Sequence, residues 1–278
     1  MMKIFEDISF HCSRYTTQRY STSFSSAIRL LHRDLRQPIY NLYGFVRFAD
    51  EIVDTFLDYD RKILLEEFKA ETYRAIERKI SLNPVLQSFQ QTVHQYELDP
   101  ELIGAFFRSM ECDLYKSAYE KEDYETYIYG SAEVVGLMCL QIFCEKDHEV
   151  YIRLKPYAQS LGAAFQKINF LRDVKADFQQ LDRVYFPGVD FHHFTMEHKQ
   201  KIEEEIKLDF TKAYEGIRQL PFKSRFGVYV AYKYYHSLFN KIREIQAERI
   251  LEERIRIPNY SKALIYLSAG VKNRLKLI

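Results

Sequence analysis

Apolar residues recur at helical spacing along almost the whole chain, rather than alternating as they do in half-buried strands. In residues 60–80, for example, Ile63 and Phe68 fall on one side of a predicted helix, and the Ser-Leu-Asn-Pro sequence at 81–84 ends it. Pro38 suits the first turn of another helix, where its missing N–H is not needed. We therefore expect helices over residues 21–31, 38–56, 60–80, 85–96, 100–116, 124–143, 151–178, 195–219 and 224–252, and in a basic C-terminal segment.

Composition narrows the fold class to an all-α domain. Hydrophobic residues make up 47% of the 278 residues and charged residues 28%, which is enough apolar material for a sizeable core and excludes a disordered chain. With only 9 Gly and 7 Pro, turns are too few for a β-sandwich or barrel. We find no repeat, linker or low-complexity segment. One all-α domain over residues 1–278 is the simplest interpretation.

Charge and cysteine usage limit the partners and the compartment. The formal net charge of +1 gives no basic excess for binding nucleic acid. The four cysteines form no C-x-x-C pair and no secretory signal precedes them, so a reduced, cytoplasmic protein is expected. No window of about 18 apolar residues occurs, so we predict no membrane span. Attachment to a membrane surface remains open.

The helix around residues 43–54 carries a narrow polar stripe. Its members are Tyr43, Arg47, Asp50 and Asp54, which fall within an arc of about 60° at 100° per residue, while the rest of the helix is largely Phe, Val, Ala and Ile.

A second stripe lies in residues 166–177. Gln166, Asn169, Asp173 and Asp177 share an arc of about 80° on a helix that is again otherwise apolar.

Either stripe alone could be a solvated face. However, like charges at i, i+4 repel, and a cation between them reverses the sign of that effect. Carboxylate and amide oxygens are ligands for Mg²⁺, which bridges such groups to phosphates, and neighbouring arginines donate to phosphate. Two such stripes favour a metal–diphosphate site.

These motifs resemble those of the squalene/phytoene synthase family of head-to-head prenyl transferases, and within it most closely a bacterial phytoene synthase. The stripes match the two Asp-rich motifs of the family, and residues 182–187 continue the second motif in a family-like way. Residues 20–24 (Tyr-Ser-Thr-Ser-Phe) and 127–136 (Tyr-x-Tyr…Val-Gly) are also similar. The resemblance extends over about residues 15–265 and implies an isoprenoid-synthase-type helical bundle around a central apolar cavity.

The sequence also departs from the family pattern. Glu51 replaces the second residue of an Asp-Asp pair, but it lies about 100° from the stripe. The run 129–133 replaces a Val-Ala-Gly-type stretch. Its Glu133 has no explanation at this stage, and pairing with a lysine or a place at the cavity mouth are both open.

The implied activity is Mg²⁺-dependent condensation of two geranylgeranyl diphosphates to phytoene, through a cyclopropyl diphosphate intermediate, in carotenoid biosynthesis. The alternative is a dehydrosqualene or squalene synthase that uses two farnesyl diphosphates. A non-catalytic scaffold of the same fold is a third reading, but such relatives typically lose the aspartates, and all four are present here.

The resemblance also assigns roles to individual residues. Expected metal ligands, for about two or three Mg²⁺ ions with Mn²⁺ as an alternative, are Asp50, Asp54, Asn169, Asp173 and Asp177. The four aspartates and Tyr127 are the expected catalytic residues. The expected diphosphate-binding residues are Ser21, Ser23, Tyr43, Arg47, Gln166, Asn169, Arg172, Tyr235, Arg254 and Lys262.

Chain length depends on the residues that line the tunnel for the prenyl tail. If the diphosphate sits at the start of the helix 21–31, Phe24 and then Ile28 face the tail. Tyr40 is expected opposite them, and Phe165 or Met138 are alternatives for the end of the tunnel. Because Ile28 leaves more room than an aromatic residue would, we favour the geranylgeranyl substrate.

Several expectations concern cofactors and location. No dinucleotide fingerprint occurs and the C-terminus is short and basic, which favours a non-reductive enzyme without nicotinamide. The expected partners are prenyl diphosphates, with no nucleic acid, and the expected state is a monomer or weak homo-oligomer. We expect a cytoplasmic protein that is peripheral to the inner face of the membrane if Lys272, Arg274 and Lys276 contact lipid.

Overall fold

The computed structural model describes residues 1–115, 121–181, 185–189, 194–250 and 254–274. Within these residues every regular element is a helix, as the hydrophobic pattern predicts. The helices are α1 (Met2–Tyr20), α2 (Thr22–Ile28), α3 (Arg33–Asp54), α4 (Arg61–Arg78), α5 (Pro84–Tyr96), α6 (Pro100–Tyr115), α7 (Lys121–Ile128), the π-helical turn η1 (Tyr129–Glu133), α8 (Val134–Cys144), α9 (His148–Leu181), α10 (Met196–Gln219), α11 (Phe222–Arg243), α12 (Ala247–Ile250) and α13 (Asn259–Arg274).

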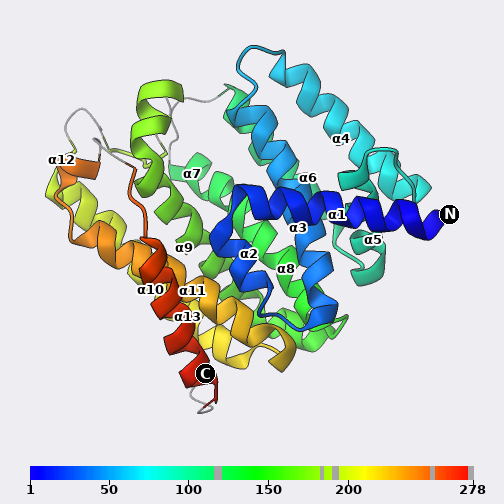
Figure 1. Cartoon of the computed structure of the whole chain (residues 1–278). Helices are drawn as coiled ribbons and strands as arrows, with labels where there is room; N and C mark the ends of the chain where they lie inside the picture. The colour runs from blue at the N-terminus through cyan, green and yellow to red at the C-terminus, as the bar shows by residue number, and fades with distance from the viewer. Residues whose placement is uncertain (116–120, 182–184, 190–193, 251–253, 275–278) are drawn as a thin grey trace.

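The bundle is arranged around α8 (Figure 1), which packs against α3, α6 and α9. Helices α1, α4 and α5 cover α3 on one side, whereas α10 and α11 lie on the other side, next to α9, and α13 packs on α11. The central helix α8 therefore separates the two helices that carry the predicted polar stripes.

Helix α3 buries two different faces. Phe45 stacks on Phe89 with ring centroids 3.9 Å apart, and Phe68, Phe106 and Phe107 surround this pair. These rings are buried behind α3. The polar stripe is on another side of the same helix and faces the interior of the bundle, as described below. Packing of the aromatic face fixes the rotation of α3 about its axis, and the polar stripe therefore points toward the interior of the bundle.

The hydrophobic pattern did not predict helix α1. Its buried residues are Ser9, Ser13 and Thr17, which are spaced like a helix face but are all polar. The Ser13 and Ser88 hydroxyls lie 2.7 Å apart in a hydrogen bond to α5, and Thr17 donates to the Ser13 carbonyl. Small hydroxyl residues can be buried when they find such partners, but they leave no apolar periodicity to detect.

Two predicted helix ends were wrong. Helix α3 begins at Arg33 rather than near Pro38, which lies inside the helix and removes one backbone hydrogen bond. Helix α11 ends at Arg243 rather than continuing to residue 252. The fully buried Lys199 donates to the carbonyl of Arg243 at 3.4 Å, which satisfies a C-terminal carbonyl.

The predicted helix 124–143 contains the π-turn η1. Here the Ser109 hydroxyl donates to the Tyr127 carbonyl at 3.1 Å, and side chains that insert into the helical ladder are a known cause of such irregularities.

The stretch Glu122–Cys144 is also long and apolar enough to cross a membrane by length and composition alone. However, 61% of its most apolar window is buried inside the bundle, so its apolar character is explained by its place in the core.

Candidate active site

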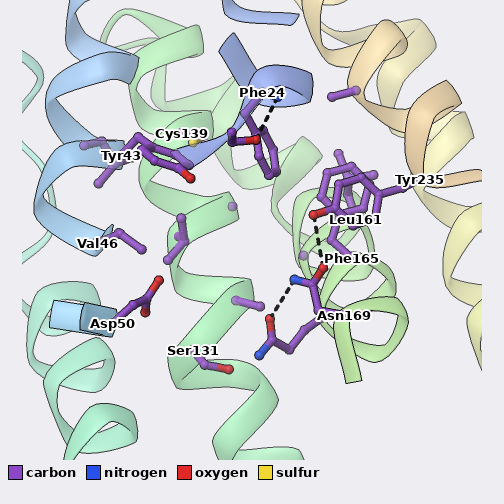
Figure 2. Close-up of a pocket in the computed structure, with 18 of the residues that line it drawn as sticks. Phe24, Tyr43, Val46, Asp50, Ser131, Cys139, Leu161, Phe165, Asn169 and Tyr235 are labelled. Carbon is purple, nitrogen blue, oxygen red and sulfur yellow. Dashed lines mark hydrogen bonds between the residues drawn. The ribbon is translucent and has the colours of Figure 1, made fainter. Parts of the chain in front are cut away.

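A cavity of about 880 Å³ runs through the bundle, between α2, α3, η1–α8, α9, α10 and α11. One end is polar and includes Asp50 and Asp54 of α3 with Asn169 and Asp173 of α9. Figure 2 shows Asp50 and Asn169 on opposite sides of the cavity. The other end is apolar, with the lining residues Ile28, Leu31, Ile39, Leu42, Leu140, Phe143, Leu154, Ile217 and Leu220. Such a cavity suits a ligand with a charged head and a long apolar tail.

All four residues of the first predicted stripe line this cavity. Asp54 is exposed and marks the mouth, whereas the accessible 30% of the Asp50 side chain belongs to the cavity wall. The pKa of Asp50 is raised to about 7, mainly by burial and then by the charge of Asp54, with a smaller effect of Asp113, and Arg47 partly offsets these effects. Burial also raises the pKa of Tyr43 to about 12, so its phenol remains protonated at neutral pH.

Arg47 is held by three groups at the polar end. Its guanidinium pairs with Glu51 one turn on, lies 3.9 Å from Asp50, and stacks 4.4 Å from the ring centroid of Tyr20. Its Nε is buried without a hydrogen-bond partner among the described residues. Glu51, which replaces an aspartate of the family pattern, therefore positions this arginine.

The second stripe forms a hydrogen-bonded chain across two helices. Tyr235 of α11 donates to the Asn169 Oδ1 at 3.2 Å, and the Asn169 Nδ2 donates to the Gln166 Oε1 at 3.4 Å. Figure 2 shows both hydrogen bonds at the cavity wall. All three residues line the cavity, so the chain orients two amide groups toward its polar end.

Asp173 lies between two arginines. Arg172 donates to it through Nε at 3.1 Å and through a terminal nitrogen at 2.5 Å, and the Arg254 Nε lies 2.7 Å from its Oδ1. Arg254 comes from the segment before α13 and is about half exposed. Two of the three predicted diphosphate-binding arginines and a predicted metal ligand thus form one cluster.

Four aromatic rings form a collar between the polar and apolar ends, namely Phe24, Tyr43, Phe165 and Tyr235. Phe165 and Tyr235 stack with centroids 3.8 Å apart, and Phe24 lies 5.8–6.2 Å from the other three rings. Because Phe165 is one turn from Asn169, it lines the middle of the cavity. Phe165 is therefore part of the cavity wall, and its effect on chain length stays a prediction.

Asp113 and Ser131 are among the polar residues of the cavity that sequence reasoning missed. Tyr127, which it did identify, donates to the Asp113 Oδ2 at 2.7 Å, and both side chains are buried. Ser131 is on the π-turn and lies between Asp50 and Asn169 in Figure 2. Neither belongs to a polar stripe that stands out from an otherwise apolar helix, so helical periodicity gave no signal for either.

The remaining predicted residues have mixed placements. Ser21 caps α2 by accepting from the Phe24 N–H at 3.1 Å and lines the cavity together with Ile28, whereas Ser23 does not line it. Lys262 lies beside the start of α2, where it donates to the Thr22 hydroxyl at 3.1 Å. The Asp177, Lys272, Arg274 and Lys276 side chains fall outside the described part of the structure.

Two of the proposed chain-length residues, Tyr40 and Met138, are not in the cavity lining, which corrects their assignment. Tyr40 is buried beneath α1, where Arg14 lies 6.0 Å from its ring centroid. Met138 is fully buried, but the cavity face of α8 consists of Val135, Gly136, Cys139, Leu140 and Phe143, on another side of the helix. Both side chains belong to the surrounding core.

Glu133 lies outside the cavity lining as well. It accepts a hydrogen bond from the Gln159 Nε2 at 2.8 Å, and burial raises the pKa of its carboxyl group. Its direct hydrogen-bond partner is therefore an amide, while the charges of Lys167 and Lys212 partly offset the effect of burial on its pKa.

The polar end provides suitable donors for a divalent cation. Among the described side chains, no three His, Cys, Asp or Glu groups are close enough to hold a metal by themselves. Nevertheless, burial and then the charge of Asp54 raise the pKa of Asp50, and a cation would relieve the repulsion between the two carboxylates. The Asn169 amide and the Asp173 carboxylate face them from α9. These groups fit Mg²⁺ held jointly by protein oxygens and a ligand's phosphates.

The sequence model of the squalene/phytoene synthase family matches residues 17–261. A 4,4'-diapophytoene synthase from Staphylococcus haemolyticus is 24% identical over 267 residues, covering 89% of this chain and 91% of that protein. A phytoene synthase from Arthrospira platensis is 24% identical over 292 aligned positions, covering 96% and 94%. The fold is similar to that of a dehydrosqualene synthase crystallised with a ligand, with a TM-score of 0.85, 21% identity and 98% of each chain covered.

Proposed function

Because this chain belongs to the squalene/phytoene synthase family, we propose that it condenses two geranylgeranyl diphosphates head to head into phytoene. The reaction proceeds through a cyclopropyl diphosphate intermediate and depends on Mg²⁺. The observation that carries the proposal is one continuous cavity with both acidic stripes at its polar end and an apolar lining at its other end.

The residues of the polar end hold the diphosphate groups. Asp50, Asp54, Asn169 and Asp173, together with Asp177, would hold Mg²⁺, which when bound neutralises the charge that develops on the departing diphosphate. Arg47, Arg172 and Arg254 contribute N–H donors to the same oxygens. Arg254 must release Asp173 when the cation and the diphosphate bind there.

The collar of Phe24, Tyr43, Phe165 and Tyr235 separates this site from the apolar end. Its rings exclude water from the reacting carbons and present their negative faces to a carbocation. The released diphosphate remains beside the reacting carbons and can accept the proton lost in the last step, so no protein base is needed.

A farnesyl-specific enzyme that makes dehydrosqualene is the second candidate. The similarity to a diapophytoene synthase and to the fold of a dehydrosqualene synthase supports it. The lining that continues beyond Ile28 to Leu31, Phe143 and Leu220 supports the longer substrate.

Purified protein incubated with radiolabelled geranylgeranyl or farnesyl diphosphate, followed by lipid extraction, distinguishes these candidates. We expect a 40-carbon hydrocarbon with Mg²⁺, none with EDTA, and the same product with or without NADPH. A 30-carbon product alone would establish the second candidate. No hydrocarbon from either substrate would overturn the prenyl synthase proposal.

A further inference from the structure

One face of the wall helix shows where the cavity changes from polar to apolar. The helix runs through α7, η1 and α8, and its residues Tyr127, Ser131, Val135, Cys139 and Phe143 line the cavity at intervals of four. Polar side chains end at Ser131, and all later members of this face are apolar or a thiol. Ser131 is therefore the last hydroxyl on this wall before the apolar half.

The two helices beside it change character at the same level. On α3 the lining passes from Asp50 to Val46, and on α9 from Gln166 to Leu161. Figure 2 shows Asp50 on one side of Ser131 and Asn169 on the other. The three walls thus form a common boundary at which a bound prenyl diphosphate would change from diphosphate to hydrocarbon.

One hydroxyl at this boundary, that of Ser131, is left unused by the described part of the protein. Its Oγ is buried and has no hydrogen-bond partner among the described residues. Helical serines elsewhere in the chain donate to the carbonyl four residues earlier, as Ser9 and Ser160 do. For Ser131 that carbonyl belongs to Tyr127 and already accepts from Ser109 at 3.1 Å. A buried hydroxyl without a partner is unfavourable, so this one calls for a bound water or ligand group.

We propose that Ser131 donates a hydrogen bond to the ester oxygen that joins the diphosphate to the prenyl chain. This inference rests on the proposed function. In the ionisation step the carbon–oxygen bond breaks and its electron pair stays on that oxygen, which leaves with the diphosphate. The Ser131 proton remains on the serine, and its hydrogen bond strengthens as negative charge develops. Ser131 is accordingly a catalytic residue that acts mainly on kcat, because the interaction is stronger in the transition state.

The test compares Ser131→Ala and Ser131→Thr with the wild type, using the prenyl diphosphate that the wild type converts. We expect kcat of the alanine variant to fall by about 10- to 100-fold with little change in KM, because a charge-assisted hydrogen bond is lost. Threonine keeps the hydroxyl and should restore most of the activity. Ser160→Ala is the matched control, since Ser160 is a buried serine of α9 outside the cavity lining, and it should behave like the wild type.

A thiolodiphosphate inhibitor, in which sulfur replaces the ester oxygen, tests which oxygen of the substrate accepts the hydrogen bond from Ser131. Its inhibition constant should be the same for wild type and Ser131→Ala, because sulfur is a weak acceptor. Weaker inhibition of the variant would place the serine on the terminal phosphate oxygens and overturn the proposal. An unchanged kcat in Ser131→Ala would also overturn the proposal. A prenyl alcohol product that the wild type makes and the variant does not would overturn it too, because it would indicate that Ser131 binds a water molecule instead. No turnover by the wild type would overturn the proposed function, and this inference with it.

Discussion

At the scale of single residues, the carboxyl group of Asp50 has the most altered environment of the two stripes. It is surrounded by protein, it is close to the charges of Asp54 and Asp113, and the nearby cation of Arg47 is shared with Glu51. The protein therefore maintains a concentration of negative charge that it could have avoided with amides or apolar residues. Such an arrangement costs stability and is typical of functional sites.

Replacing Asp50 by Asn should abolish most of the Mg²⁺-dependent turnover while the fold stays intact. Loss of one electrostatic stabiliser of a leaving group typically costs on the order of 10²–10³ in rate. The same change at Asp173 should have a similar effect, because each aspartate serves a different stripe. Product formation measured over a Mg²⁺ titration tests this, with circular dichroism as the control for folding. Activity near the wild-type level in both variants would contradict the mechanism.

The same Asp50→Asn variant should be at least as stable as the wild type at neutral pH in the absence of metal. The pKa of Asp50 is raised from 3.8 to about 7, so between these values the folded state binds more protons than the unfolded state. Its contribution to stability therefore falls as pH rises from about 4 to 7. Asparagine removes this contribution. Urea unfolding of both proteins at pH 4.5 and 7.5 should show that the free energy of unfolding of the variant, relative to that of the wild type, increases as pH rises. The opposite trend would contradict the argument.

The sequence predicted residues that repeat on one helix face and missed those that do not. Stepping around the helix placed Tyr43, Arg47 and Asp50 together, and the structure places all three on the cavity. Asp113 and Ser131 reach the same cavity from other helices, and only the packing of α6 and η1 against α3 and α9 brings them there. Single polar residues of this kind carry no local signal in one sequence.

At the scale of helices, the contact between α1 and α3 is made by small residues. A Cβ added to Gly44 of α3 would lie 2.9 Å from the Ser13 Oγ and 3.2 Å from the Ser13 Cα. The two helices therefore approach closely through a glycine and a serine, and the Ser13–Ser88 hydrogen bond extends the contact to α5. This explains why an amphipathic pattern predicted most of the helices but not α1.

Gly44→Ala should destabilise the protein by about 1–3 kcal/mol, the usual cost of overpacking, in spite of the better helix propensity of alanine. Gly270→Ala is the matched control. Gly270 is also inside a helix, but apart from its own helix backbone no atom of the described residues lies within 4 Å of its added Cβ, so this variant should be neutral or slightly stabilised. The free energy of unfolding in urea measures both. Equal effects of the two substitutions would contradict the close packing of α1 on α3.

At the scale of the whole molecule, the cavity joins a charged mouth to an apolar interior, and the expected product is an insoluble hydrocarbon. We therefore propose that the protein contacts a membrane surface, aided by Lys272, Arg274 and Lys276. Each basic residue near an anionic surface contributes about 1 kcal/mol. Flotation with vesicles of anionic lipid should recover the wild type, and replacing the three residues by Glu should reduce the recovery. Vesicles of neutral lipid are the control, and no association of the wild type with anionic vesicles would contradict the proposal.

The length of the cavity should decide which substrate is preferred, and Ile28 is the position at which to test it. This side chain is only 4% exposed, lines the cavity beyond the aromatic collar, and is followed by Leu31 one turn on. A geranylgeranyl tail must extend farther past Ile28 than a farnesyl tail. Ile28→Phe should therefore lower the ratio of 40-carbon to 30-carbon product when both substrates compete. Arg29→Phe, which adds the same ring outside the cavity lining, is the control and should keep the wild-type ratio. If Ile28→Phe also keeps that ratio, the tail does not pass position 28, and its end must be set by other residues of the apolar lining.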